Sequence, residues 1–146
     1  MLAIGDEVLR GEIVNANAAF LSERLFELGI EIVEHVVVSD DPTAIRGPLL
    51  RLRATIDVVI ATGGLGPTED DRTVDVVADL LGVESPAHPA SLEAMKQRFS
   101  THGFELTPNN LRQVHVPEGG EALPNAAGSL TFCEPNRQQG FFRSAF

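Results

Sequence analysis

The sequence predicts an α/β protein in which a mainly parallel sheet is flanked by helices. Short apolar runs alternate with segments of helical periodicity along the first half of the chain, an order typical of strand–helix–strand units. The clearest of these apolar runs leads directly into a glycine-rich loop. The 146 residues correspond to one ordinary domain, which is long enough to bury a core without disulfides or metals.

The first part of the chain contains two predicted strands and one predicted helix. Residues 2–4 form a short apolar run that ends at a Gly-Asp pair. Residues 17–28 are predicted to be helical, because leucines recur at three- and four-residue intervals and Gly29 supplies a stop. The β-branched run 30–38 predicts the second strand, and it ends in Ser-Asp-Asp-Pro, which is typical of a helix start.

The next elements continue this alternation. Apolar residues at helical spacing predict a helix after Pro42, and Pro48 within it predicts a kink or a late start. Residues 57–61 are the clearest strand, a buried apolar run. A third helix is expected to end at Leu81, and a further one is expected over residues 91–102.

The composition excludes several classes of function. Eleven Lys and Arg residues stand against 21 Asp and Glu residues, and the resulting net charge of −10 disfavours nucleic-acid and membrane-surface partners. A single cysteine, Cys133, and four dispersed histidines exclude a disulfide scaffold and a zinc finger. No apolar run approaches the roughly 20 residues of a membrane span. We therefore expect a cytoplasmic protein with neither nucleic acid nor membrane as a partner.

Three predicted loops meet at the carboxyl edge of the sheet, where parallel α/β sheets bind their ligands. They contain Gly5 and Asp6, then Asp40 and Asp41, then residues 63–71. Acidic residues and glycines thus gather along one rim. We expect the functional site there.

The glycine-rich loop has the composition of an anion-binding site. Gly63, Gly64 and Gly66 leave the backbone N–H groups free to approach an anion closely, and the N-terminus of the following helix favours negative charge. The loop lacks the Gly-Lys-Ser/Thr of a Walker A motif and the Gly-x-Gly-x-x-Gly spacing, and it follows the third strand instead of the first. A dinucleotide site of the Rossmann type is therefore disfavoured.

Two interpretations of the residues after these glycines are about equally supported. Thr68 and Asp71 fit a capping box ahead of an apolar helix. However, Glu69, Asp70 and Asp71 carry more negative charge than a cap requires. If phosphate binds here, a divalent cation between it and these carboxylates relieves the repulsion, and Mg²⁺ prefers such oxygen ligands.

Three motifs carry a resemblance to a known family. They are Gly-Asp-Glu-Val-Leu-Arg-Gly over residues 5–11, Asn-x-Asn over 15–17, and Gly-Gly-Leu-Gly-Pro-Thr-x-Asp-Asp-x-Thr over 63–73. Together they resemble the N-terminal domain of CinA, competence/damage-inducible protein A, which is similar to the molybdopterin-binding fold of MoaB and MogA. The resemblance covers about residues 2–129 and implies a three-layer αβα sandwich with a mainly parallel sheet.

The resemblance also implies an activity and a set of site residues. In CinA-like domains the activity is hydrolysis of a nucleotide pyrophosphate, usually ADP-ribose, assisted by a divalent metal and K⁺. Asp71, Thr73 and Asp40 match functional positions of the family and are the expected catalytic residues. Mg²⁺ or Co²⁺ would be held by Asp71, Asp6 and Asp70.

The remaining expectations concern the ligand and the partners. Contacts to phosphate or ligand are expected from Gly63, Gly64, Gly66, Thr68, Gly5 and Asn17. Asn15 and Asn17 are equally suited to capping the first helix and to reaching the ligand. An alternative function is a non-catalytic module that binds molybdopterin or a nucleotide. The family also implies self-association into a homo-oligomer.

The C-terminal residues depart from the family pattern. Gly128 and Ser129 begin a familiar loop, but Leu130 and the residues after it do not continue it. We therefore expect a domain over residues 1–129 and an atypical tail over 130–146, produced by a truncation or a change of reading frame.

Overall fold

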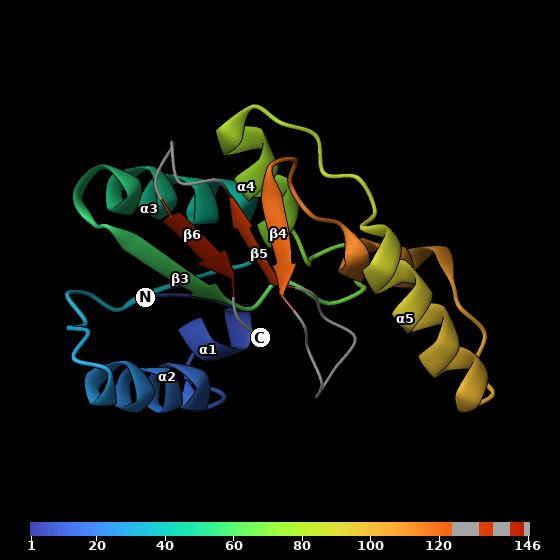
Figure 1. The fold of residues 1–146 in the computed structure, drawn as a ribbon. Coiled ribbons are helices and arrows are strands. Elements are labelled where there is room, and N and C mark those ends of the chain that lie inside the picture. Colours follow the sequence, from blue (N-terminus) through green and yellow to red (C-terminus); the bar gives the residue numbers. More distant parts are fainter. Residues whose placement is uncertain (124–131, 136–140, 145–146) are drawn as a thin grey trace.

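The computed structural model describes residues 1–123, 132–135 and 141–144, and within these it contains one parallel sheet between two layers of helices (Figure 1). The sheet has the strand order β2-β1-β3-β6, and all its pairs are parallel. Its strands are β1 (Leu2–Ile4), β2 (Val36–Val38), β3 (Val58–Thr62) and β6 (Phe141–Ser144). A separate antiparallel pair joins β4 (Gly120–Leu123) to β5 (Phe132–Pro135). The predicted α/β fold with a mainly parallel sheet is confirmed.

The helices lie on both faces of the sheet. In Figure 1, α1 and α2 lie below the sheet, α3 and α4 lie above it, and α5 stands apart at the right of the view. In chain order they are α1 (Asp6–Leu9), α2 (Ala16–Glu27), α3 (Pro42–Thr55), α4 (Thr73–Leu81) and α5 (Pro89–Thr101), followed by a 3₁₀ helix, η1 (Pro108–Val114).

The core is built where α3 covers the sheet. Ile45, Leu49 and Leu52 repeat at helical spacing, and all three are buried against the sheet together with Leu2 of β1. The helix begins at Pro42 and runs through Pro48, so the late start expected from that proline is wrong. A proline is well suited to the first turn of a helix, because the N–H that it lacks has no partner there.

The second strand is shorter than the sequence predicts. Only Val36–Val38 pair with β1, whereas residues 30–35 were expected to be part of the same strand. A β-branched run becomes a strand only where a neighbour offers a ladder, and β1 extends no further back than Leu2. The short helices α1 and η1 were not expected, because four and seven residues are too few to show a clear period.

The C-terminal segments that the structure describes are strands. β5 pairs with β4, and β6 pairs with β3 in the register Val58↔Phe141. The division of the chain after residue 129 stays a prediction, and so does the origin of the tail.

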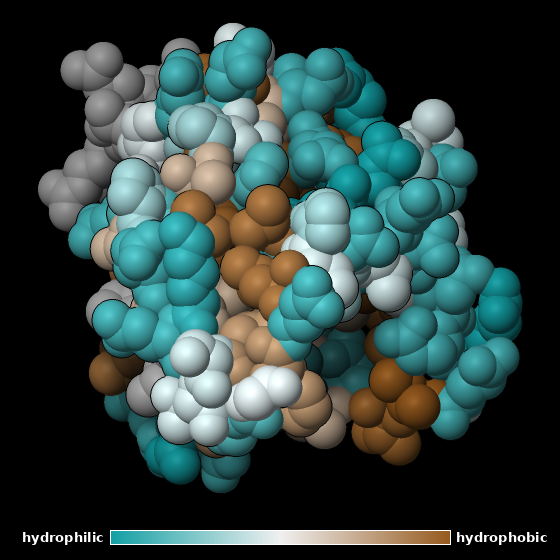
Figure 2. All heavy atoms as spheres, turned by 90° about the vertical axis from the view of Figure 1, so that its right-hand side faces the viewer, coloured by the Kyte–Doolittle hydropathy of each residue, from teal (hydrophilic) through white to brown (hydrophobic). Residues whose placement is uncertain are grey.

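The surface is largely polar on the face that carries α5, where a few hydrophobic side chains are grouped among hydrophilic ones (Figure 2). Among the helices of the described part of the chain, none is long and apolar enough to cross a membrane.

Candidate functional site

The glycine-rich loop after β3 is folded tightly against the protein itself. Gly63 has φ +94°, and a Cβ atom there would lie 1.9 Å from the carbonyl oxygen of Ile4. Gly64 has φ +62°, and a Cβ atom there would lie 2.3 Å from Thr73 Oγ1. Both positions therefore require glycine for close packing and for their left-handed backbone, whatever ligand the loop binds.

Thr73 fastens this loop to the start of α4. Its side chain is almost fully buried, with 1% of the residue exposed, and its hydroxyl donates to the carbonyl oxygen of Gly63 at 2.8 Å. Its backbone N–H donates to the carbonyl of Gly64 at 3.2 Å. The hydroxyl is thus used inside the loop, and the expected catalytic role of Thr73 stays a prediction.

Asp71 closes a turn instead of capping the helix. Its Oδ2 accepts from the N–H of Thr68 at 2.8 Å and from the Thr68 hydroxyl at 2.6 Å. The helix α4 starts later, and its N-cap, Arg72, makes no side-chain cap. Of the two hydrogen bonds of the expected capping box, only the one from the backbone N–H of Thr68 to the Asp71 side chain is present. It stabilises the turn over residues 68–71. A Cβ on Gly66 would lie 2.6 Å from Asp71 Oδ2, so this carboxylate packs directly on the loop.

Asp40 lies where the three loops converge. Its Oδ2 accepts a hydrogen bond from the backbone N–H of Asp6 at 2.9 Å. Burial raises the pKa of this carboxyl above its ordinary value, the Asp6 N–H opposes that shift, and the negative charges of Glu7, Asp6 and Asp71 raise the pKa further. The structure thus places two other expected residues, Asp6 and Asp71, within electrostatic reach of Asp40.

The neighbouring Asp41 has a different task, although the sequence does not distinguish it from Asp40. It is the N-cap of α3, and its carboxylate accepts from the N–H groups of Thr43 and Ala44. The hydrogen bond from the Thr43 hydroxyl, together with these two backbone bonds, holds the pKa of Asp41 below its usual range. Asp40, not Asp41, is therefore the carboxylate available at the rim.

The expected metal ligands do not form a ready cage. Within the described residues, no group of three or more His, Cys, Asp or Glu side chains is arranged to hold a metal ion. Asp6 is engaged in an ion pair with Arg10, and Asp70 is exposed. Mg²⁺ commonly binds through one or two carboxylates together with substrate phosphates, and Asp71 at the rim would supply one such carboxylate.

An open cleft of about 300 Å³ lies beside the glycine-rich loop, between β1, β3 and the start of α2. Gly63, Glu7 and Asn17 are among its lining residues. Asn15 also borders the cleft, but its Oδ1 accepts from the N–H of Ala18 and caps α2. Of the two asparagines, Asn15 is thus the cap, and Asn17 is exposed beside the cleft. Gly5 is buried at the end of β1, where its N–H donates to the carbonyl oxygen of Val38 in β2.

Sequence reasoning missed two residues of this region. Arg112 of η1 donates through Nη2 to the carbonyl of Asp71 at 3.1 Å and to Asp75 at 2.9 Å, so it clamps the loop against α4. It is 41 residues from Asp71 in the chain, and no pattern in the sequence connects them. Glu7, in contrast, adjoins Asp6 in the Gly-Asp-Glu motif and could have been included on that ground.

Comparison with known proteins places the chain in a family. A family model described as the probable molybdopterin binding domain matches residues 1–135. A CinA-like protein of Anaeromyxobacter sp. (strain K) is 43% identical over 129 residues, and one of Dictyoglomus thermophilum is 40% identical over 129 residues. Each alignment covers 88% of this chain, which spans about a third of these relatives, namely 32% and 31% of their lengths.

Solved structures support the same relationship. The protein CinA with unknown function from Thermoplasma acidophilum superposes with a TM-score of 0.86 at 28% identity, covering 98% of this chain and 83% of that one. The molybdopterin biosynthesis enzyme MoaB from Thermus thermophilus superposes with a TM-score of 0.57 at 19% identity, covering 98% of this chain and 76% of that one; this shows a common fold. The chain therefore belongs to the family of the probable molybdopterin binding domain, and its similarity to CinA-like proteins confirms the resemblance carried by its motifs.

Proposed function

We propose that this domain hydrolyses a nucleotide pyrophosphate such as ADP-ribose at the carboxylate rim. The observation that carries the proposal has two parts: Asp40 and Asp71 interact electrostatically at the rim, where Asp71 packs on Gly66 of the glycine-rich loop, and an open cleft borders Gly63 of the same loop. The cleft offers room next to backbone N–H groups, and the carboxylates offer proton acceptors. Both are needed to hold and cleave a pyrophosphate.

The chemistry requires a base near the phosphate. Water oxygen forms a bond to one phosphorus, the bridging P–O bond breaks, and the attacking water loses a proton; ADP-ribose would give AMP and ribose phosphate. Asp40 is suited to take that proton, because a carboxyl group with a raised pKa is a better base than an ordinary one. A divalent cation, Mg²⁺ or Co²⁺, would neutralise phosphate charge when bound, with Asp71 as a protein ligand and K⁺ as an assisting ion.

The experiment is product analysis with purified protein, ADP-ribose, a divalent cation and K⁺. We expect AMP from the wild type and a loss of about 100-fold or more with Asp40→Asn or Asp71→Asn. Asp41→Asn is the matched control: it lies next to Asp40 and asparagine also caps helices well, so its turnover should stay near that of the wild type. Full turnover of Asp71→Asn with an intact fold would contradict the assignment.

A second candidate is a module that binds molybdopterin or a nucleotide without chemistry. It is supported by the description of the matching family and by the lack of a ready metal cage among the described residues. This candidate predicts saturable binding in calorimetry, with heat but no AMP, and binding that survives Asp40→Asn. The two candidates therefore differ in product and not only in affinity.

A further inference from the structure

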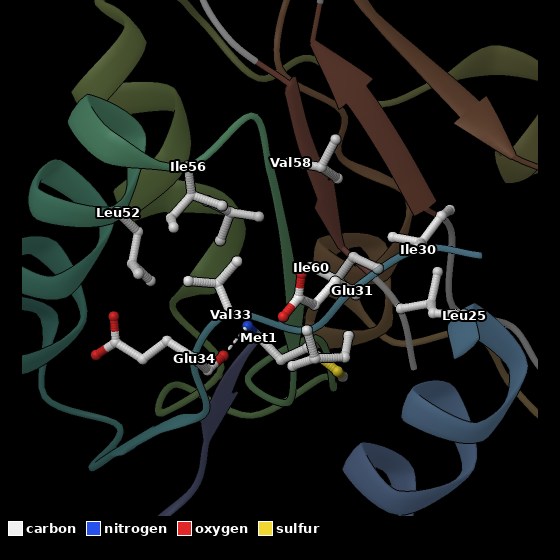
Figure 3. A pocket seen from close by; sticks show the side chains of 12 residues that line it. Met1, Leu25, Ile30, Glu31, Val33, Glu34, Leu52, Ile56, Val58 and Ile60 are labelled. Atoms are coloured by element: carbon white, nitrogen blue, oxygen red, sulfur yellow. Dashed lines mark hydrogen bonds between the residues drawn. The ribbon is translucent and has the colours of Figure 1, made fainter. Parts of the chain in front are cut away.

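Two hollows at opposite ends of the sheet differ in their lining. An apolar groove of about 310 Å³ at the amino end is walled mainly by aliphatic side chains, among them Leu25 and Leu52 (Figure 3). A smaller, polar hollow of about 80 Å³ lies against the glycine-rich loop, and Asp71, Asp75 and Arg112 are among its lining residues. The smaller hollow therefore adjoins a carboxylate to which the proposed function gives a role.

Arg112 reaches this hollow from η1, a segment distant in the chain. Its Nη2 donates to the carbonyl oxygen of Asp71 at 3.1 Å and to Oδ2 of Asp75, in the first turn of α4, at 2.9 Å. Of the Arg112 side chain, 34% is exposed, so the ion pair with Asp75 is partly shielded from water. One nitrogen thus joins the backbone of Asp71 to α4.

The other hydrogen bonds of Asp71 stay within its own turn. Its carboxylate accepts from the N–H and the hydroxyl of Thr68, and its N–H donates to the carbonyl of Thr68 at 3.2 Å. These bonds span four residues and set the shape of the turn. The bond from Arg112 comes from 41 residues away, so it sets where the turn lies on the protein.

A second arginine separates this tie from the ion pair that accompanies it. Arg72 donates through Nε to the same Oδ2 of Asp75, at 3.2 Å. Both arginines therefore pair with one carboxylate, and Arg112 is the one that also bonds to the carbonyl of Asp71. An effect seen on changing Arg112 and not on changing Arg72 belongs to Asp71.

The guanidinium of Arg112 is used through one of its nitrogens. Its Nε is buried, and among the described residues it has no hydrogen-bond partner. A buried donor without an acceptor costs free energy, so the stabilising contacts come from Nη2 and not from Nε. A lysine at this position would carry a methylene in place of Nε, and its ammonium group can donate to two acceptors.

We propose that Arg112 is a positioning residue of the carboxylate rim: through Nη2 it holds the backbone of Asp71 against α4, and so keeps the Asp71 carboxylate in place for the reaction. The inference rests on the proposed hydrolysis of a nucleotide pyrophosphate. Arg112 takes no proton and contacts no reacting atom in this assignment. It supplies a fixed position, on which the rate of a reaction between bound groups depends steeply.

The test compares AMP release from ADP-ribose, with a divalent cation and K⁺, by the wild type, Arg112→Met, Arg112→Lys and Arg72→Met. We expect Arg112→Met to lower kcat about tenfold or more and to change KM by about threefold at most, because the cleft beside Gly63 is untouched. Arg112→Lys should recover most of the rate, and Arg72→Met should stay near the wild type. Equal losses in Arg112→Met and Arg72→Met would overturn the inference, since the shared pair with Asp75 would then be the cause.

A second readout needs neither substrate nor cation. Hydrogen exchange at the N–H of Asp71 reports how firmly the turn is held. We expect exchange about tenfold faster in Arg112→Met, and exchange near that of the wild type in Arg112→Lys and Arg72→Met. Should Arg112→Met not fold, Arg112→Gln, whose amide is too short to span both acceptors, carries the same comparison.

The two readouts separate the inference from the proposed function. If the wild type released no AMP, the proposed function would be wrong, while faster exchange in Arg112→Met alone would still show that Arg112 positions Asp71. Unchanged exchange in Arg112→Met would overturn the inference whatever the turnover. A lysine variant as impaired as Arg112→Met would overturn the assignment of the tie to a single nitrogen.

Discussion

The two ends of the parallel sheet differ in how closely they are packed and in which side chains line them. At the carboxyl end, the loop after β3 is packed so closely that Gly63 leaves no room for a Cβ atom, and charged groups surround it. At the amino end, an aliphatic groove of similar volume to the cleft lies open. The size of a hollow therefore does not by itself single out a candidate site. A gathering of ionisable side chains with a shifted pKa does, because such groups cluster at functional sites.

The largest effect is expected from Gly63→Ala in the loop at the carboxyl end. We expect it to cost about 4 kcal/mol or more, or to prevent folding, because the added carbon would lie 1.9 Å from the Ile4 carbonyl oxygen. Gly103→Ala is the matched control: its φ is +70°, but nothing lies within 4 Å of its added carbon, so only backbone strain of about 1 kcal/mol is expected. Urea unfolding measures both. Equal losses would show that the loop can relax and is not tightly packed.

The next effect is expected from Thr73→Val, which removes the hydroxyl that ties the loop to α4. Because the group is buried and donates to the carbonyl of Gly63, we expect a loss of about 1–3 kcal/mol. Thr101→Val is the control, since its hydroxyl also donates to a carbonyl, that of Gln97, but on the exposed surface of α5. A loss of about 0.5 kcal/mol or less is expected there. Thermal unfolding of the two variants under the same conditions shows whether the larger loss of stability follows from the burial of the Thr73 hydroxyl.

Much of the carboxyl end could be predicted from the sequence, and less of the amino end. The glycine-rich loop can be recognised in the sequence, because three glycines and several acidic residues follow an apolar run. Which of Asp40 and Asp41 faces the rim could not be predicted, because both follow the strand and only the start of α3 assigns one of them as its cap. Residues 30–35 have strand composition, but pairing depends on a neighbour that is distant in the chain.

The contribution of Arg112 lay beyond sequence reasoning for the same reason. Its contact with Asp71 joins elements that are far apart along the chain, and nothing in either segment signals the other. The local sequence pattern therefore located the loop, whereas the hydrogen bonds of Arg112 in η1 to Asp71 and to Asp75 of α4 complete its support. Functional sites in α/β proteins are built from several loops, so the residues contributed by the most distant segments are the hardest to foresee.

The smallest effect concerns the pH dependence of stability. It compares two adjacent carboxyl groups, Asp40 and Asp41, whose pKa values are shifted in opposite directions. The pKa of Asp40 is raised in the folded protein, so the folded state binds the proton more tightly than the unfolded one. Its contribution to stability is therefore greatest below the unfolded pKa and is lost as the pH rises through the folded value. Asp40→Asn should make the protein slightly more stable than the wild type at pH 7, and this difference should vanish in acid.

Asp41 should behave in the opposite way. Its pKa is lowered by the hydrogen bonds of the α3 cap, first that from the Thr43 hydroxyl, so its contribution is present above the unfolded pKa and is lost as the pH falls through the folded one. Asp41→Asn should be slightly destabilising at pH 7 and neutral in acid. Urea midpoints of the wild type and both variants across pH 3–7 measure how much each substitution changes the stability. Because every comparison is with the wild type at the same pH, the titration of all other groups cancels. Differences of the same sign would mean that the two carboxylates share one environment and that the rim does not single out Asp40.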